Sequence, residues 1–86
     1  MSATESPLAE RVRSVLLRDW DPAAIGQNAK LRDEYDEFIP RVIPAIESRA
    51  GTAELTALLR TFEAEMHAPI DDQARERAAE ALASLR

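Results

Sequence analysis

The sequence predicts an all-α fold, a small bundle of about four helices with a long first loop and a proline-kinked second helix. Apolar residues recur at spacings of three and four along most of the chain, as they do on one face of a helix. No segment alternates between apolar and polar residues for long enough to indicate a strand. Only two glycines accompany 45 % hydrophobic and 31 % charged residues, a composition typical of an ordered helical domain.

The first periodic segment predicts a helix that begins at Ser6-Pro7, where serine can cap and proline suits the first helical position. It is expected to end at Asp21-Pro22, because proline disfavours helix at the residue before it. Gly26 and Asn28 then indicate a loop of about ten residues. The face of this helix is formed by Leu8, Val12, Val15, Leu16 and Trp20.

A second periodic segment continues in phase across two prolines, Pro40 and Pro44. Each proline lacks an amide and crowds the carbonyl four residues earlier. We therefore expect one kinked helix, or two short helices that share a buried face, with the change of direction near Ile39 to Arg41. The apolar stripe comprises Leu31, Tyr35, Phe38, Ile39, Val42, Ile43 and Ile46.

Two further helices complete the predicted bundle. Gly51 is available for a left-handed cap, and Thr52 begins the third helix. Pro69 breaks the chain, and Asp71 or Asp72 can cap the last helix. The third helix is expected to bury Leu55, Leu58, Leu59, Phe62 and Met66. The last helix is expected to bury Ala74, Ala78, Ala81, Leu82 and Leu85.

The 86 residues form a single helical domain, 1–86, because a chain of this length cannot build a second core. Residues 1–5 are expected to be a flexible N-terminus. The N-terminus lacks the apolar region of a secretory signal, and the longest strongly apolar run, Val15 to Leu17, is far shorter than the ~20 residues that span a bilayer. We therefore expect a soluble cytoplasmic protein that does not associate with membranes.

Charge and composition also exclude several classes of binding site and catalytic site. The net charge of −5, from 16 acidic and 11 basic residues, argues against a general nucleic-acid binder and is compatible with a basic protein partner, or simply with solubility. The absence of cysteine excludes disulfides, cysteine-ligated zinc and thiol chemistry. The serines lack a nucleophile-elbow context, and two isolated glycines make no phosphate loop. We expect no catalytic residues and no cofactor.

The corner between the first two helices resembles a known family. Trp20-Asp21-Pro22 followed by Gly26 is similar to the W-D-P…G corner of the YugE-like proteins, a family of small bacterial proteins of unknown function. Pro69-Ile70, an acidic cap, and then Ala78 and Leu82 resemble the closing helix of that family, so the resemblance extends over roughly residues 8–86. The shorter W-D-P-x-G form of the corner is replaced here by a longer spacing before Gly26. The resemblance implies a compact all-helical fold in a bacterial cytoplasm and lends no activity or functional residue.

The segment DEYDE contains the strongest candidate site. Asp33, Glu34, Asp36 and Glu37 are predicted to lie in the first turns of the second helix, where carboxylates favour the positive end of the dipole, with Tyr35 on the buried side. The first interpretation is an acidic turn over a core tyrosine. The second is an acidic patch that receives Arg or Lys from a partner protein. A metal site on Asp33, Asp36 and Glu37 is the third, although no histidine accompanies them.

Glu63, His67 and Trp20 are the other candidates. Glu63 and the single histidine, His67, share a helix face at i, i+4 and predict a surface ion pair or a partly buried capping histidine, with a metal or acid–base pair as the alternative. Trp20 is expected to close the open end of the bundle, with its indole N–H bound to a carbonyl or water. An exposed Trp20 would instead anchor an interface.

Three hypotheses for function follow. The favoured one is a non-catalytic protein-interaction module that docks a basic partner through an acidic edge, and a toxin-neutralising immunity protein is a specific form of it. The second is a structural homo-oligomer that pairs through the alanine face of the last helix or through Leu17. The third, ranked last, is a metal-dependent enzyme. The acidic edge consists of Asp21, Asp33, Glu34, Asp36 and Glu37.

Overall fold

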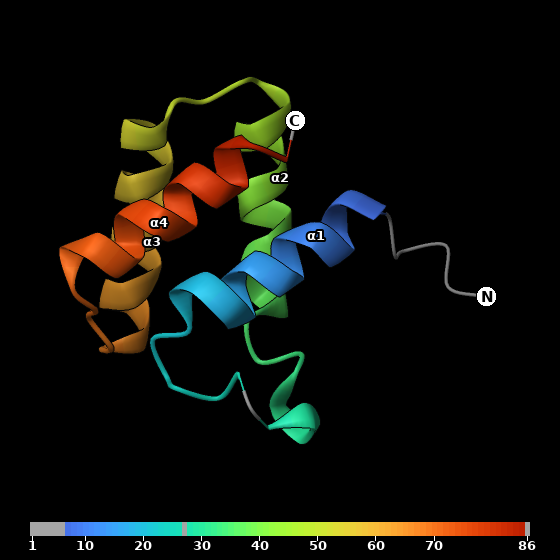
Figure 1. The fold of residues 1–86 in the computed structure, drawn as a ribbon, viewed down its shortest axis with the longest axis vertical. Helices are drawn as coiled ribbons and strands as arrows, with labels where there is room; N and C mark the ends of the chain where they lie inside the picture. The colour runs from blue at the N-terminus through green and yellow to red at the C-terminus, as the bar shows by residue number, and fades with distance from the viewer. Residues whose placement is uncertain (1–6, 27, 86) are drawn as a thin grey trace.

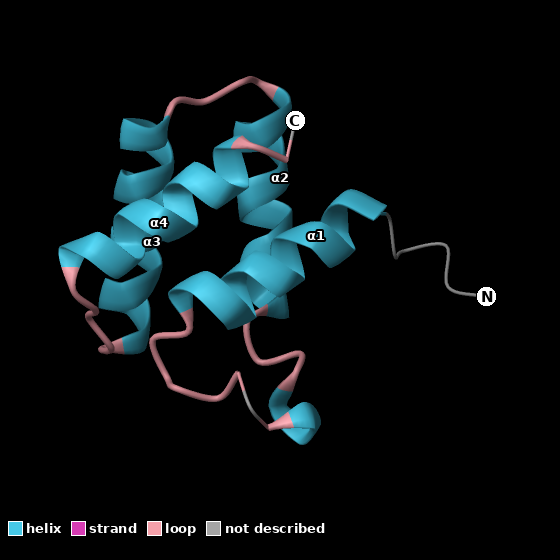
Figure 2. Cartoon of the chain, viewed as in Figure 1, coloured by secondary structure: helices cyan, strands magenta, loops and turns pink. Residues whose placement is uncertain are grey.

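The computed structural model describes residues 7–26 and 28–85, and this part of the chain is all-α, with four α-helices and no strand (Figures 1 and 2). The fold class predicted from the sequence is confirmed. The expected flexibility of residues 1–5 and the expected cap at Ser6 lie outside the described residues. None of the helices described is both long and apolar enough to cross a bilayer.

The first helix, α1, extends over Pro7–Val15 and continues into a π-helical turn, Leu16–Trp20. The turn closes when the amide of Asp21 donates to the carbonyl of Leu16, 2.8 Å away. Asp21 then adopts the left-handed conformation, with φ of 38°, and the chain turns away. The helix therefore ends where Pro22 predicted that it would.

Between Asp21 and Phe38 the described residues form turns and two short 3₁₀ helices, Ala29–Leu31 and Asp36–Phe38, rather than the start of a regular helix. The prediction that residues 31–38 open the second α-helix is wrong. The reason is Pro40, whose ring would collide with the carbonyl four residues earlier in a helix that began at Leu31.

The second helix, α2, instead begins at Ile39 and extends over Ile39–Glu47. Pro40 therefore occupies the first turn, where no amide is required. Pro44 lies inside the helix, which continues past it. The change of direction at Ile39 is within the predicted range, and it separates a 3₁₀ turn from an α-helix.

The end of α2 corrects a second prediction. Arg49, not Gly51, adopts the left-handed conformation, with φ of 63°. The amides of Arg49 and Ala50 donate to the carbonyls of Ile46 and Ala45, at 3.0 and 2.9 Å, a Schellman pattern that requires the left-handed residue directly after the last turn. Gly51 comes too late for this role and is extended, with φ of −77°.

The third helix, α3, extends over Thr52–Met66, and the fourth, α4, over Asp72–Ala83. Thr52 begins α3 as predicted, and the carboxylate of Glu54 accepts from the Gly51 amide at 3.3 Å. Asp71 caps α4 by accepting from the Ala74 amide at 2.7 Å, which confirms the predicted acidic cap.

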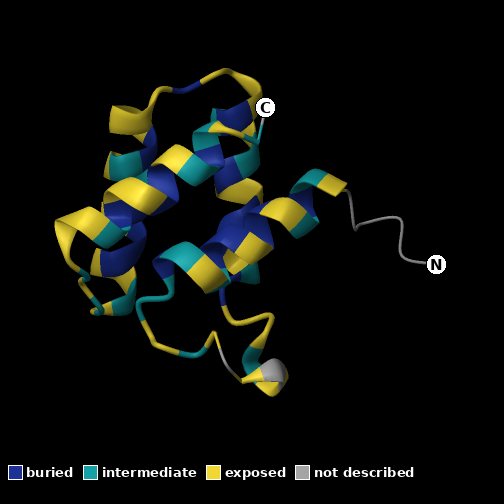
Figure 3. Cartoon of the chain, in the orientation of Figure 1, coloured by how far each residue is buried: buried dark blue, intermediate teal, exposed yellow. Residues whose placement is uncertain are grey.

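The helices form two layers. In the view of Figure 1, α1 and α4 cross in front of α2 and α3, and α1 packs on α2 while α4 packs on α3 and on the π-helical turn. The buried faces of the helices meet between these layers (Figure 3). At one end of the core the ring of Trp20 lies 5.2 Å from that of Tyr35 and 5.8 Å from that of Phe38, and Phe38 stacks on Phe62 at 4.3 Å.

Most of the predicted core residues are buried. Leu8 is half-buried, while the other members of the α1 stripe are buried. On α3 and α4 the half-buried exceptions are Leu58, Met66, Ala74, Ala81 and Leu85. Trp20 is only 3 % exposed, so it closes the bundle as predicted, but its indole N–H donates to the carboxylate of Glu63 and not to a carbonyl or water. The buried apolar set comprises Ala9, Val12, Val15, Leu16, Trp20, Tyr35, Phe38, Ile39, Val42, Ile46, Ala50, Leu55, Leu59, Phe62, Ala78, Ala79 and Leu82.

Candidate functional site

Glu63 lies at the centre of a buried network that joins three segments of the chain. Its side chain is 3 % exposed and faces the guanidinium of Arg75, which is 5 % exposed. Arg75 Nε and Nη2 donate to Glu63 Oε2 and Oε1 at 2.9 and 2.6 Å. The indole N–H of Trp20 donates to Oε2 at 2.9 Å, and the Ile70 amide donates to Oε1 at 3.2 Å. One carboxylate therefore holds α3, α4 and the π-helical turn together.

The same contacts fix the charge of the pair. Burial alone raises the pKa of Glu63, but the hydrogen bonds from Arg75, Trp20 and Ile70 outweigh it and leave the pKa lowered. The pKa of Arg75 is raised, first by its hydrogen bond to Glu63. Arg75 also donates to Asp72 Oδ1 at 2.6 Å and to the Ile70 carbonyl at 2.9 Å. Both groups stay ionised, and their hydrogen-bonding atoms are used inside the fold.

The predicted pair of Glu63 with His67 does not form. Glu63 is directed into the core, while His67 is exposed at the end of α3, where it adopts the left-handed conformation with φ of 54°. The backbone of His67 ends the helix, since its amide donates to the Ala64 carbonyl at 3.2 Å, but its side chain is exposed and is not the partly buried capping histidine that the sequence predicts. No group of three or more His, Asp or Glu side chains among the described residues is arranged to hold a metal ion.

Asp21, the first member of the acidic edge, is engaged inside the loop. Its Oδ1 accepts from the hydroxyl of Tyr35 and the amide of Ile25, both at 2.8 Å, and its Oδ2 accepts from the amide of Gly26 at 2.9 Å. The Tyr35 oxygen accepts in turn from the Ala23 amide at 2.9 Å. Burial of Tyr35, together with the nearby Asp21 carboxylate, raises the pKa of the phenol. Asp21 and Tyr35 therefore close the first loop.

Asp36 is also engaged. Arg13 of α1 donates to it with Nε and Nη2, both at 2.8 Å, which is the bidentate geometry that guanidinium and carboxylate prefer. Arg13 is buried and also pairs with Glu10, which accepts from Arg32 at 2.8 Å. This network attaches the 3₁₀ turn at Asp36 to the first helix.

The other three members of the acidic edge remain on the surface. Asp33, Glu34 and Glu37 are exposed, and their carboxylates make no hydrogen bond or ion pair with a described residue. They lie in the turn and the 3₁₀ helix around the two anchors, Tyr35 and Asp36. The structure therefore divides the acidic edge into two internal carboxylates and an exposed part, Asp33, Glu34 and Glu37.

Sequence reasoning missed the charged residues of the core, although one signal was available. Arg75 stands three, four and seven residues before Ala78, Ala79 and Leu82, so it belongs to the apolar stripe of its helix. Glu63 likewise follows Leu59 by four residues on the inner face of α3. Two opposite charges on two buried stripes indicate a buried ion pair, because a lone buried charge is too costly. Arg13 carries the same spacing signal, since it stands three and seven residues before the buried Leu16 and Trp20.

A scan against protein-family models, a search of curated proteins and a search of solved structures each found no match for this chain. The resemblance of the Trp20-Asp21-Pro22 corner to the YugE-like family therefore stays a prediction.

Proposed function

We propose that the protein is a non-catalytic protein-interaction module that docks a basic partner protein through the exposed part of the acidic edge. The observation that carries this proposal is the contrast between internal and external charges. Every buried side-chain nitrogen or oxygen among the described residues has a hydrogen-bond partner. The carboxylates of Asp33, Glu34 and Glu37, in contrast, face solvent without such a partner among those residues.

The attachment of this segment supports the proposal. The ring of Tyr35 is buried and its hydroxyl is bound at both donor and acceptor positions, while Asp36 is held by Arg13. The backbone that carries Glu34 and Glu37 is therefore fixed before any partner arrives. A preorganised segment loses less conformational entropy on binding, so more of the electrostatic attraction is retained as affinity.

The local charge also favours a basic partner. Arg32 is paired with Glu10 and Asp36 with Arg13. Arg41, whose charge Glu37 senses, is paired with Glu65. This leaves Lys30 as the cation in residues 30–37 that has no such pair among the described residues, against the three exposed carboxylates. A toxin-neutralising immunity protein is one form of this proposal, in which the basic partner would be the toxin. Acidic surfaces of this kind steer basic partners and raise the association rate.

A capture experiment with matched variants tests the proposal. Glu34→Gln/Glu37→Gln removes two carboxylates from the edge, and Glu76→Gln/Glu80→Gln removes two exposed carboxylates from α4, so the net charge changes equally. Tagged wild type and both variants are incubated with lysate of the source organism, and the captured proteins are identified by mass spectrometry. We expect a basic protein on wild type and on the α4 variant that is lost from the edge variant. Capture of the same proteins by all three, or by none, would contradict the proposal.

A further inference from the structure

A hollow of about 600 Å³ opens on another part of the surface, where the start of α1, the outer side of α2 and the residues after α4 meet. Its apolar lining comes from Leu8, Ile43 and Leu85, which are only half-buried in the monomer, together with the buried Ile46. Pro7 completes the apolar rim at the start of α1. Contact between water and these aliphatic side chains is unfavourable, so an apolar group that filled the hollow would bind with a favourable free energy.

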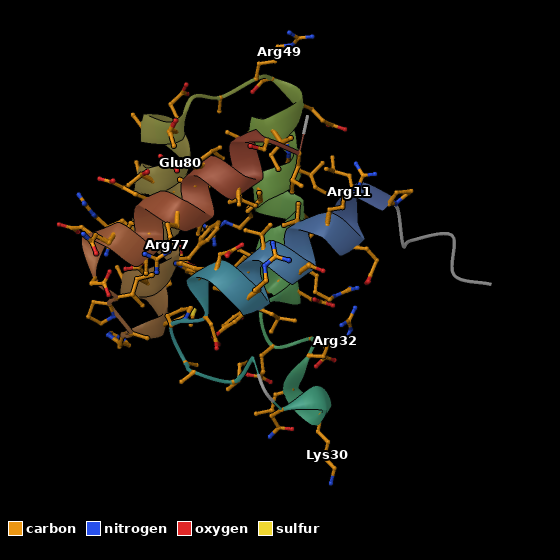
Figure 4. The ribbon with its side chains drawn as sticks, viewed as in Figure 1. Arg11, Lys30, Arg32, Arg49, Arg77 and Glu80 are labelled. Carbon is orange, nitrogen blue, oxygen red and sulfur yellow. The ribbon has the colours of Figure 1, made fainter. Side chains whose placement is uncertain are left out.

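Two arginines flank this hollow. Arg11 projects from α1, and Arg49 projects from the end of α2 (Figure 4). Both are exposed, and neither makes a hydrogen bond or ion pair through its side chain with a described residue. Among the described lining residues Glu47 is the one acid, so these residues give the hollow a positive excess on a chain whose net charge is −5.

Arg49 occupies a conformation that disfavours its side chain. Its φ is 63°, in the left-handed region where glycine is preferred at the end of a helix. The backbone would be relaxed by glycine at this position, yet the residue present places a cation beside the hollow. A strained residue whose charge has no partner among the described residues, next to an apolar hollow, is consistent with a role in binding.

The lining and its charges indicate what kind of occupant fits. A second copy placed hollow to hollow on a two-fold axis would bring the arginines of both copies into one interface, where like charges repel. A convex ridge fills it, and a helix with apolar residues at i, i+3, i+4 and i+7 provides one. Arg11 and Arg49 then require carboxylates on the flanks of that ridge.

We infer that the hollow between Leu8, Ile43 and Leu85 docks an amphipathic helix of a partner protein, with carboxylates beside its apolar ridge that pair with Arg11 and Arg49. This site is separate from the exposed part of the acidic edge. It selects an acidic partner surface, whereas the acidic edge selects a basic one. None of the described residues that line the hollow belongs to the acidic edge, so the inference does not depend on the function proposed above. Synthetic peptides test it separately.

The test uses two helical peptides of about 16 residues with the same leucine ridge, one with glutamates and one with lysines beside the ridge. Each is titrated into ¹⁵N-labelled protein and followed by NMR. Arg11→Glu/Arg49→Glu is compared with Lys30→Glu/Arg77→Glu, which reverses two other exposed cations that Figure 4 labels. Circular dichroism confirms that both variants fold.

We expect wild type to bind the glutamate peptide roughly tenfold more tightly than the lysine peptide, with the largest shifts around Leu8, Ile43 and Leu85. Arg11→Glu/Arg49→Glu should reverse this preference, and Lys30→Glu/Arg77→Glu should keep it. Equal affinity for both peptides, no binding at millimolar peptide, or shifts elsewhere on the molecule would overturn the inference. So would a wild-type dimer in sedimentation that Arg11→Glu/Arg49→Glu converts to monomer, since a second copy would then occupy the site.

Discussion

Glu63 and Arg75 face each other across α3 and α4 as a bidentate ion pair, at 2.6 and 2.9 Å, with both side chains at most 5 % exposed. The pair connects the two longest helices to Trp20 and so to the end of the first helix. Removal of one partner destabilises a protein more than replacement of both partners by apolar residues, because the remaining charge stays buried without its counter-charge.

Removal of the Glu63 charge should therefore destabilise the protein severely. Glu63→Gln leaves Arg75 without its counter-charge, and we expect a loss of about 3–5 kcal/mol in the free energy of unfolding, measured by urea denaturation. The control is Glu65→Gln, which breaks the exposed ion pair with Arg41. A loss for Glu63→Gln as small as that for Glu65→Gln would show that the buried pair is not structural.

Acid should weaken the fold through the same residue. The folded-state pKa of Glu63 lies below its ordinary value of 4.5, so the unfolded chain binds a proton first as pH falls. The stabilisation is fully present above about pH 4.5 and is lost as pH falls through the folded pKa. Urea unfolding followed by the fluorescence of Trp20, the single tryptophan, should show lower midpoints at pH 3 than at pH 7. Midpoints that rise on acidification would contradict this assignment.

A rise in pH should also destabilise the fold, in this case through Tyr35. Burial and Asp21 raise its folded-state pKa above the ordinary value of 10.0, so its stabilisation is present below pH 10 and is lost as pH rises above it. The chain has one tyrosine, so absorbance at 295 nm reports this residue alone. We expect phenolate to appear only as the protein unfolds, and to appear near pH 10 in urea. Ionisation near pH 10 with helicity intact would contradict the buried hydrogen bond.

The two glycines should respond differently to alanine. A Cβ at Gly26 would lie 2.5 Å from the Leu17 carbonyl oxygen and 2.9 Å from Asp21 Oδ2, whereas a Cβ at Gly51 meets nothing within 4 Å. Gly26→Ala must displace backbone, and we expect a loss of about 1–3 kcal/mol in unfolding free energy. Gly51→Ala should change it by less than about 0.5 kcal/mol. Equal losses at both positions, measured by thermal unfolding, would count against the close packing of Gly26 on the end of the first helix.

The sequence predicted helices wherever apolar periodicity and end signals agreed. Pro7, Asp21-Pro22, Thr52 and Asp71 mark helix ends that the structure confirms. The prediction for residues 31–38 failed, because apolar spacing cannot distinguish a helix from successive tight turns that bury the same residues. Pro40 argues against a helix from Leu31, since a proline beyond the first turn removes a hydrogen bond and crowds the carbonyl four residues earlier, a cost that α2 bears only at Pro44.

The candidate site was predictable only in part. The carboxylates of the acidic edge were visible in the sequence, but the long-range partners that divide them were not. Arg13 meets Asp36 across 23 positions, and Tyr35 meets Asp21 across 14. Such pairs depend on how the elements pack, which local spacing does not specify. The hollow beside Arg11 and Arg49 was not predicted either, because it is formed by three separate parts of the chain.

Measuring the affinity of the captured partner for three proteins tests most directly whether the exposed part of the acidic edge forms the interface. The proteins are wild type, Glu34→Gln/Glu37→Gln and Glu76→Gln/Glu80→Gln, each compared at the same ionic strength and with its melting temperature recorded. We predict a dissociation constant roughly tenfold higher for the edge variant, with its melting temperature and the affinity of the α4 variant unchanged. Equal affinity for all three proteins would contradict the proposed interface.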